Sequence, residues 1–187
     1  MYKHIAKSYN ELHQEEQLKK LAIIKQNIKI IPPLLDIGCG TGISTNYFAE
    51  LIGMQGVDKG NAESWTHRVH KGNAGSPYVG VDNCKEMLAE GKKQYHNLQY
   101  ASAEKLPFTD NSFSTIISVT AFHNFKNMEK ALKEIKRVSR NNNIAISFLK
   151  KSKKLNSFRN IISKYYKFKE VEEEKDVIFI IRNKKDI

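Results

Sequence analysis

One carboxylate and three glycines lie close together early in this sequence. Asp36 follows an apolar run that begins at Leu34, and Gly38, Gly40 and Gly42 come after it. Glycine adopts positive φ readily and has no Cβ atom, so a ligand can lie directly against such a backbone. A helix that opens here would present unpaired N–H groups, and Asp36 can accept hydrogen bonds from the loop or from the ligand. The pattern predicts a buried strand, a ligand-binding turn and a helix.

The glycine spacing excludes two common phosphate-binding loops. A dinucleotide fingerprint requires G-x-G-x-x-G, but counting from Gly38 or Gly40 places Ile43 or Thr45 at the third glycine. A P-loop requires Gly-Lys followed by Ser or Thr, which this loop lacks. Residues 35–42, LDIGCGTG, instead closely resemble the first motif of class I S-adenosylmethionine (SAM)-dependent methyltransferases, particularly the ubiquinone-biosynthesis type. The resemblance implies SAM as cofactor, bound by the carboxylate and glycines of this loop.

Two carboxylates compete for the ribose of the expected cofactor. An ionised carboxylate only accepts hydrogen bonds, which suits a vicinal diol at the end of the second strand. Asp58 lies 20 residues after Gly38, but its Gly-Val-Asp triplet recurs with Asp82. Either Met54–Asp58 is the second strand, or Tyr78–Asp82 is. We favour Asp82, because the sequence after it resembles the family's strand-to-helix junction and retains a helix N-cap.

Residues 59–80 are predicted to be an insertion loop. They contain no Ile or Leu and therefore have little to bury. They hold the only tryptophan, Trp65, together with His67, Arg68 and His70. These side chains suit contact with a substrate or RNA, although a tolerated surface insertion is the simpler interpretation. Two histidines without further ligands are weak evidence for a metal site, and we predict none.

A later segment, Leu98–Phe113, is similar to the family's G-D-A-E-x-L-P-F-x-D-x-S-F-D motif. Ser102 stands where the family usually has the aspartate that holds the adenine amino group, and Ser114 stands where another aspartate commonly follows. We expect Ser102 Oγ and the Ala103 N–H group to hold the adenine edge. Because serine carries no charge, this contact is expected to be weaker by about 1–2 kcal/mol.

His123 is the candidate catalytic residue. It follows the predicted buried strand 115–120, and ligands of doubly wound sheets lie beyond the carboxyl ends of the strands. The family often has a histidine at this position, near the methyl group and the acceptor. Two interpretations stay open: His123 orients or deprotonates the acceptor, or it caps the following helix.

The first 31 residues are expected to form a helical lid segment. The pattern predicts a helix over 5–30 that ends at Pro32 and Pro33, with an apolar stripe along one side (Leu12, Leu18, Leu21, Ile24 and Ile28). In many small-molecule methyltransferases a similar helix folds over the cofactor, and Tyr9 matches its tyrosine. An ordinary half-buried helix residue is an equal interpretation of Tyr9.

The order of the motifs implies an α/β fold. It would be a doubly wound three-layer sandwich around a mostly parallel seven-stranded sheet whose last strand is antiparallel. Helices are predicted at 44–52, 128–139 and 155–166, and strands at 144–149, 168–171 and 177–181. A chain of 187 residues fits a single domain, residues 1–187.

Composition bears on the partners and the compartment. The net charge of +11 fits RNA as a partner, although solvated lysines explain it more simply. The sequence shows no signal-peptide pattern, no apolar run of membrane length, and no metal or disulfide spacing of its two cysteines, so we expect a cytoplasmic protein without membrane contact. We expect methyl transfer to a small-molecule acceptor. RNA methylation, or SAM binding with little catalysis, are the alternatives.

Overall fold

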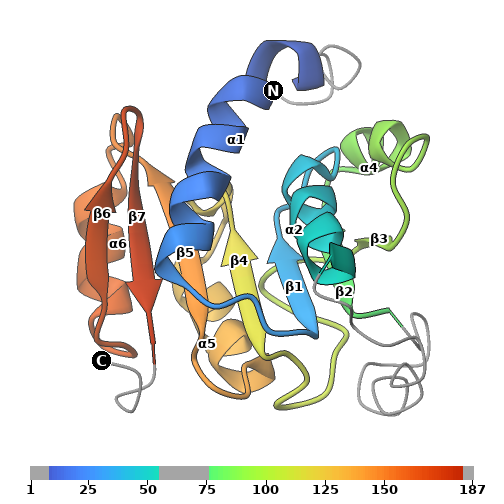
Figure 1. Cartoon of the computed structure of the whole chain (residues 1–187). Coiled ribbons are helices and arrows are strands. Elements are labelled where there is room, and N and C mark those ends of the chain that lie inside the picture. The colour runs from blue at the N-terminus through green and yellow to red at the C-terminus, as the bar shows by residue number, and fades with distance from the viewer. Residues whose placement is uncertain (1–8, 55–75, 183–187) are drawn as a thin grey trace.

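A single mixed sheet forms the centre of the protein. The computed structural model describes residues 9–54 and 76–182, with side chains for residues 13–53 and 76–182. Seven strands follow the order β3-β2-β1-β4-β5-β7-β6 (Figure 1). They are β1 (Leu34–Ile37), β2 (Tyr78–Asp82), β3 (Leu98–Tyr100), β4 (Thr115–Ser118), β5 (Ile144–Leu149), β6 (Lys169–Glu172) and β7 (Asp176–Ile181). Strands β1 to β5 pair in parallel and β7 is antiparallel to β5 and β6, which confirms the expected sheet.

Helices cover both faces of the sheet and complete the three layers. On one face lie α1 (Tyr9–Asn27) and α2 (Ile43–Met54), where Leu21 and Phe48 share an apolar cluster with Ile178 of β7. On the other face lie α5 (Met128–Val138) and α6 (Leu155–Ile162), in a second cluster that includes Phe179. The alternation of Ile178 and Phe179 shows a strand buried on both sides, as the centre of a doubly wound fold requires. Two shorter elements, α4 (Lys85–Gly91) and η3 (Phe122–Asn124), follow β2 and β4.

The second strand is the one ending at Asp82. Strand β2 pairs in parallel with β1, and its Gly80 lies opposite Asp36. This confirms the favoured register, whereas Met54 is the last residue of α2 and does not begin a strand. Several residues of the competing register and the predicted insertion lie outside the described part of the chain (Asp58, Trp65, His67, Arg68 and His70).

The inward face of α1 differs from the predicted apolar stripe. Leu21, Ile24 and Ile28 are buried as expected, but Leu18 is 38% exposed and Lys20 is completely buried. A lysine is rarely buried unless an ion pair compensates its charge, and Lys20 has such a pair. The helix begins at Tyr9 within the predicted span, and the side chain of Tyr9 lies outside the described residues.

Candidate functional site

An open cavity lies beyond the carboxyl ends of β1, β2 and β4. Counting the space open to solvent, it has a volume of about 680 Å³. Its walls come from the glycine loop, the end of β2, the segment after β3, and the turn after β4 (Gly38, Gly40, Val81, Asp82, Asn83, Cys84, Met87, Ala101, Ala103, Val119, Thr120, Ala121, Asn124 and Phe125). This is the edge at which doubly wound sheets bind their ligands.

The glycine loop adopts a backbone that requires glycine. Gly38, Gly40 and Gly42 have φ of 76°, 57° and 90°, in the left-handed region that side chains disfavour. A Cβ atom on Gly38 would lie only 2.3 Å from the Cβ atom of Ala121. The loop therefore exposes bare main chain to the cavity through Gly38 and Gly40, as the sequence predicts, while Gly42 does not line the cavity.

Asp82 links the glycine loop to the cavity wall. Its Oδ2 accepts a hydrogen bond from the Gly40 N–H group at 2.8 Å, and its Oδ1 accepts one from Cys84 N–H at 2.7 Å. Burial raises the pKa of this carboxyl, and the backbone N–H groups oppose that rise. A carboxylate has about four acceptor positions, so Asp82 can still accept further hydrogen bonds from a ligand.

The capping argument that favoured Asp82 was wrong although the strand was right. The N-cap residue of α4 is Cys84, and its side chain makes no capping hydrogen bond. Asp82 instead accepts the Cys84 N–H group two residues ahead, as aspartate often does in turns.

Asp36 links the end of β1 to the start of α2. It is completely buried and does not line the cavity, and its Oδ2 accepts hydrogen bonds from Ser44 Oγ and Thr45 Oγ1, both at 2.6 Å. Burial raises its pKa to about 6 against the opposing effect of the two hydroxyls. These partners belong to the first turn of α2 rather than to the glycine loop, and a contact of Asp36 with the ligand stays a prediction.

The two residues proposed to hold adenine are placed differently. Ala103 lines the cavity, whereas Ser102 does not, and its Oγ accepts a hydrogen bond from Glu104 N–H at 3.2 Å. Nothing in the part of the chain that the structure describes tests their contact with adenine. The neighbouring Ala101 lines the same wall and was not singled out from the sequence.

His123 lies next to the cavity without lining it. Its ring packs against Phe148 with the centroids 6.0 Å apart, and its Nδ1 is buried with no hydrogen-bond partner among the described residues. Burial lowers the pKa of the imidazole, and Asp176 opposes that effect. The residues on either side of η3, Ala121 and Phe125, do line the cavity. His123 is thus close to the cavity wall, and its catalytic role stays a prediction.

Thr120, which sequence analysis missed, shapes the wall after β4. Its φ is 52°, a conformation that costs a non-glycine residue about 1–2 kcal/mol. Its N–H group donates to Ser147 Oγ at 2.8 Å, and its Oγ1 donates to Asp176 Oδ2 at 2.8 Å. Threonine gives no sequence signal for a left-handed turn, since glycine and asparagine are the usual residues there.

A smaller cavity joins α1 to the same loop. Gln17 of α1 lines it together with Gly38, Gly40 and Val119, which also line the large cavity. Thus α1 borders the glycine loop through Gln17, and its role as a lid stays a prediction.

Comparison with known proteins identifies the fold. Residues 57–147 match a family described as a methyltransferase domain. The chain is 30% identical over 148 residues to an uncharacterized protein of Methanocaldococcus jannaschii, covering 78% of this chain and 48% of that protein. It is 25% identical over 179 residues to a demethylmenaquinone methyltransferase of Staphylococcus epidermidis, and the match covers 90% of this chain and 66% of that protein. The crystal structure of a SAM-dependent methyltransferase from Aquifex aeolicus matches with a TM-score of 0.61 and 20% identity, covering 90% of this chain and 87% of that one. The chain therefore has the fold of SAM-dependent methyltransferases, and just under half of it is similar in sequence to the methyltransferase domain family.

The chain spans about half the length of the first of these relatives and just under two thirds of the second. Within residues 9–54 and 76–182, no helix is both long and apolar enough to cross a membrane. In the same described residues, no group of three or more His, Cys, Asp or Glu side chains is arranged to hold a metal ion.

Proposed function

We propose that this protein transfers a methyl group from SAM to a small-molecule acceptor. The observation that carries the proposal is the placement of Asp82. Its carboxylate lies in the wall of the cavity and is anchored to the glycine loop by Gly40 N–H. A fixed acceptor therefore stands beside exposed backbone, which suits a ligand with a vicinal diol and a polar tail.

The residues of the cavity fit SAM. Asp82 would accept hydrogen bonds from the ribose hydroxyls with its remaining lone pairs, and the bare backbone at Gly38 and Gly40 leaves room for the amino-acid part. Ala101 and Ala103 give small apolar walls for the flat adenine ring. When bound, SAM supplies an electrophilic sulfonium methyl group, so the protein needs mainly to align the reactants.

The turn after β4 is the wall that the acceptor would meet. Val119, Ala121 and Phe125 are apolar residues there, and they would keep water away from the reacting atoms. His123 lies in the same turn, and its lowered pKa keeps the imidazole neutral at pH 7. A neutral imidazole can take a proton from an acceptor hydroxyl, amine or activated carbon.

A small molecule is the acceptor class we favour. The relative from Staphylococcus epidermidis is named for methylation of demethylmenaquinone, which is not a macromolecule. RNA remains an alternative on net charge alone. An RNA acceptor would lose affinity steeply with added salt, whereas the small-molecule proposal predicts no such loss. We also propose a cytoplasmic location, in keeping with two free thiols, Cys39 and Cys84.

Calorimetric titration with SAM, with NAD as the control ligand, tests the proposal. We expect micromolar binding of SAM, no binding of NAD, and loss of SAM binding in Asp82→Ala. Asp58→Ala is the matched variant, because the competing register would give it the ribose contact, and we expect it to bind SAM normally. Thermal melts of each variant show whether it is folded. Failure of the folded wild-type protein to bind SAM would overturn the proposal, and binding without turnover of any acceptor would favour a catalytically weak SAM-binding protein.

A further inference from the structure

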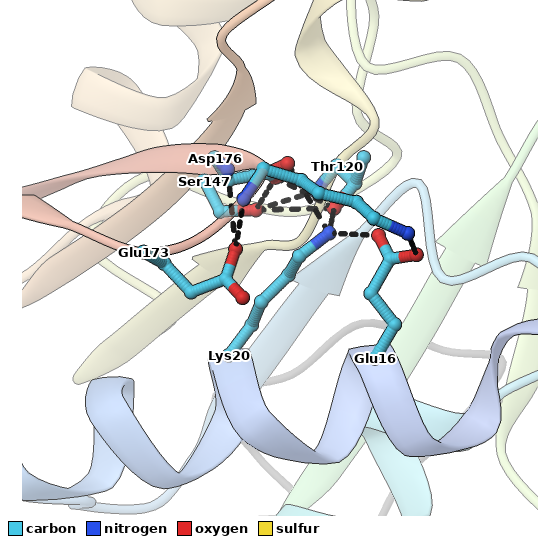
Figure 2. A network of polar contacts seen from close by, with 7 residues as sticks. Glu16, Lys20, Thr120, Ser147, Glu173 and Asp176 are labelled. Atoms are coloured by element: carbon cyan, nitrogen blue, oxygen red, sulfur yellow. Dashed lines mark hydrogen bonds and ion pairs between the residues drawn. The ribbon is translucent and has the colours of Figure 1, made fainter.

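A buried network of charges joins three distant parts of the chain. Figure 2 shows Lys20 of α1 pointing at Asp176 of β7 and Thr120 after β4. Lys20 Nζ lies 3.2 Å from Asp176 Oδ1, without the alignment of a hydrogen bond, and both side chains are completely buried. The same ammonium group donates to Thr120 Oγ1 at 3.0 Å and to Glu16 Oε1 at 2.7 Å.

The outer part of the network fastens α1 to the β6–β7 turn. Glu16 lies one helical turn before Lys20 and also accepts a hydrogen bond from Lys175 Nζ at 2.7 Å. Burial raises the pKa of Glu16, but the two lysines outweigh it and bring the pKa to about 2. The carboxylate is therefore ionised at neutral pH, and α1 carries a paired anion and cation against this turn.

The inner part of the network holds Thr120 in its left-handed conformation. Asp176 Oδ2 accepts hydrogen bonds from Thr120 Oγ1 at 2.8 Å and from Ser147 Oγ at 2.7 Å, and that serine oxygen accepts the Thr120 N–H group. A strained residue persists only where its surroundings fix it from several sides. Here the backbone and the side chain of Thr120 are both fixed by groups that meet at Asp176.

The conformation of Thr120 sets the cavity wall. Thr120 and Ala121 both line the cavity, and Ala121 Cβ occupies the space beside Gly38 that no side chain on Gly38 can share. A shift of the turn at Thr120 would move Ala121 relative to the glycine loop. Lys20 also lies one turn from Gln17, which borders that loop from α1. The network therefore lies beside the glycine loop on two sides. On one side Thr120 positions Ala121 against Gly38, and on the other Lys20 lies one turn from Gln17.

Stability alone is a poor explanation for this network. Replacing a buried ion pair by apolar residues of similar volume is often neutral or stabilising, because removing charges from water is costly. The surrounding helix face and strand are otherwise apolar, with Leu21 and Ile24 on α1 and Ile178 on β7 buried in one cluster. An apolar pair would fit this setting but would not hold Thr120.

We propose that Lys20 and Asp176 are positioning residues of the cofactor site, which hold Thr120 in its left-handed conformation and fasten α1 beside the glycine loop. The proposal rests on the proposed function, because the ligand whose affinity they set is SAM. Neither residue touches the cavity, so they act through Thr120.

A cycle of variants at positions 120 and 176 tests the proposal. We expect Asp176→Asn to weaken SAM binding by about tenfold, a typical coupling between residues in contact. Thr120→Gly provides the reference background, because glycine adopts this φ without strain and needs no partner to hold it. In the Thr120→Gly background, Asp176→Asn should change the affinity less than threefold. An equal loss in both backgrounds would overturn the proposal, since a merely structural aspartate acts independently of residue 120.

The control is another ion pair between a helix and the edge hairpin. Arg159 of α6 pairs with Glu170 of β6 at 2.8 Å, and neither residue lines either cavity described above. Glu170→Gln should leave SAM affinity within twofold of wild type. A loss as large as that of Asp176→Asn would show that any damage near the hairpin weakens binding, and it would overturn the proposal.

A measurement without ligand separates this proposal from the proposed function. Hydrogen exchange followed by mass spectrometry should show faster exchange over 119–125 in Asp176→Asn, and over both 119–125 and α1 in Lys20→Met. Glu170→Gln should change neither segment. If wild type binds no SAM, the proposed function fails, while exchange still decides whether the pair holds the turn. Unchanged exchange at 119–125 in Asp176→Asn would overturn the positioning role.

Discussion

Ala121 Cβ lies 2.3 Å from the position that a Cβ atom on Gly38 would occupy. The loop after β1 and the turn after β4 therefore meet through a methyl group and bare backbone. Phe125 adds to the contact, with ring atoms 3.7 Å from the same position. Gly38, Ala121 and Phe125 all line the cavity, so this close approach forms part of its wall.

We expect Gly38→Ala to destabilise the protein strongly. The added methyl group clashes with Ala121, at a cost of about 1–3 kcal/mol for overpacking, and φ of 76° costs about 1–2 kcal/mol more. Chemical denaturation measures the sum. Adding Ala121→Gly to the same chain should relieve the clash and restore that part of the unfolding free energy, while the cost of the positive φ remains. Full restoration of the wild-type unfolding free energy would contradict the assignment of a separate cost to φ.

Gly53→Ala is the matched control for that substitution. Gly53 lies in α2 and a Cβ atom there would meet nothing within 4 Å. Because alanine favours helices over glycine, we expect the free energy of unfolding to rise by about 0.5–1 kcal/mol. If both substitutions lower the free energy of unfolding, the added methyl groups destabilise the protein for reasons other than the contact with Ala121.

Asp36→Asn should change how stability depends on pH. The pKa of Asp36 is raised by burial to about 6 in the folded protein, from an ordinary value of 3.8. Between these values the folded state holds a proton that the unfolded state has lost, so this residue lowers stability as pH rises from about 4 to 6. The unfolding free energy of the variant relative to that of wild type should therefore rise by on the order of 3 kcal/mol between pH 4 and pH 7. Urea unfolding of both proteins at the two pH values measures this change. If the unfolding free energies of variant and wild type differ by the same amount at both pH values, the raised pKa is contradicted.

The fold was predictable because several local signals agreed. LDIGCGTG marked the strand, the turn and the helix, and Tyr78–Asp82 was favoured as the second strand. The strand 144–149 was predicted with the bounds it has in the structure. Apolar periodicity and glycine both report short-range geometry, which the chain encodes within a few residues.

The finer features of the site could not be predicted because they depend on long-range partners. Lys20 and Thr120 are 100 residues apart in the chain, and the turn residue Thr120 has no local preference for positive φ. The apolar stripe wrongly placed Leu18 inward, since hydrophobicity alone cannot show that Asp176 makes room for a lysine. The Ser102 hydroxyl differs from these cases, because it accepts a hydrogen bond from Glu104 N–H only two residues ahead, a local contact of the kind that serine often makes in turns.

Arg137→Lys should loosen the segment that follows Ala103 in the cavity wall. Arg137 donates to the carbonyl oxygens of Phe108 at 2.6 Å and Leu106 at 3.1 Å, and it pairs with both carboxylate oxygens of Glu134. Lysine cannot reproduce this planar set of donors, and we expect a loss of about 1–3 kcal/mol of unfolding free energy. Arg159→Lys is the control, because that arginine also pairs with a carboxylate (Glu170) through two nitrogens. Arg137 also donates to Asp110 Oδ1 at 2.9 Å, so a smaller loss in Arg159→Lys would attribute the difference to the contacts with Asp110 and the two carbonyl groups together.

The half-buried imidazole of His123 should make the protein sensitive to mild acid. Burial lowers the pKa of His123 in the folded state below its ordinary value of 6.5. As pH falls below 6.5 the unfolded chain takes up a proton before the folded protein does, so stability present at higher pH is progressively lost. His123→Phe removes this proton uptake and keeps an aromatic ring against Phe148. Urea unfolding at pH 7.5 and pH 5.5 should therefore show a smaller loss on acidification in the variant. An equal loss in both proteins would mean that His123 takes up its proton equally well folded and unfolded.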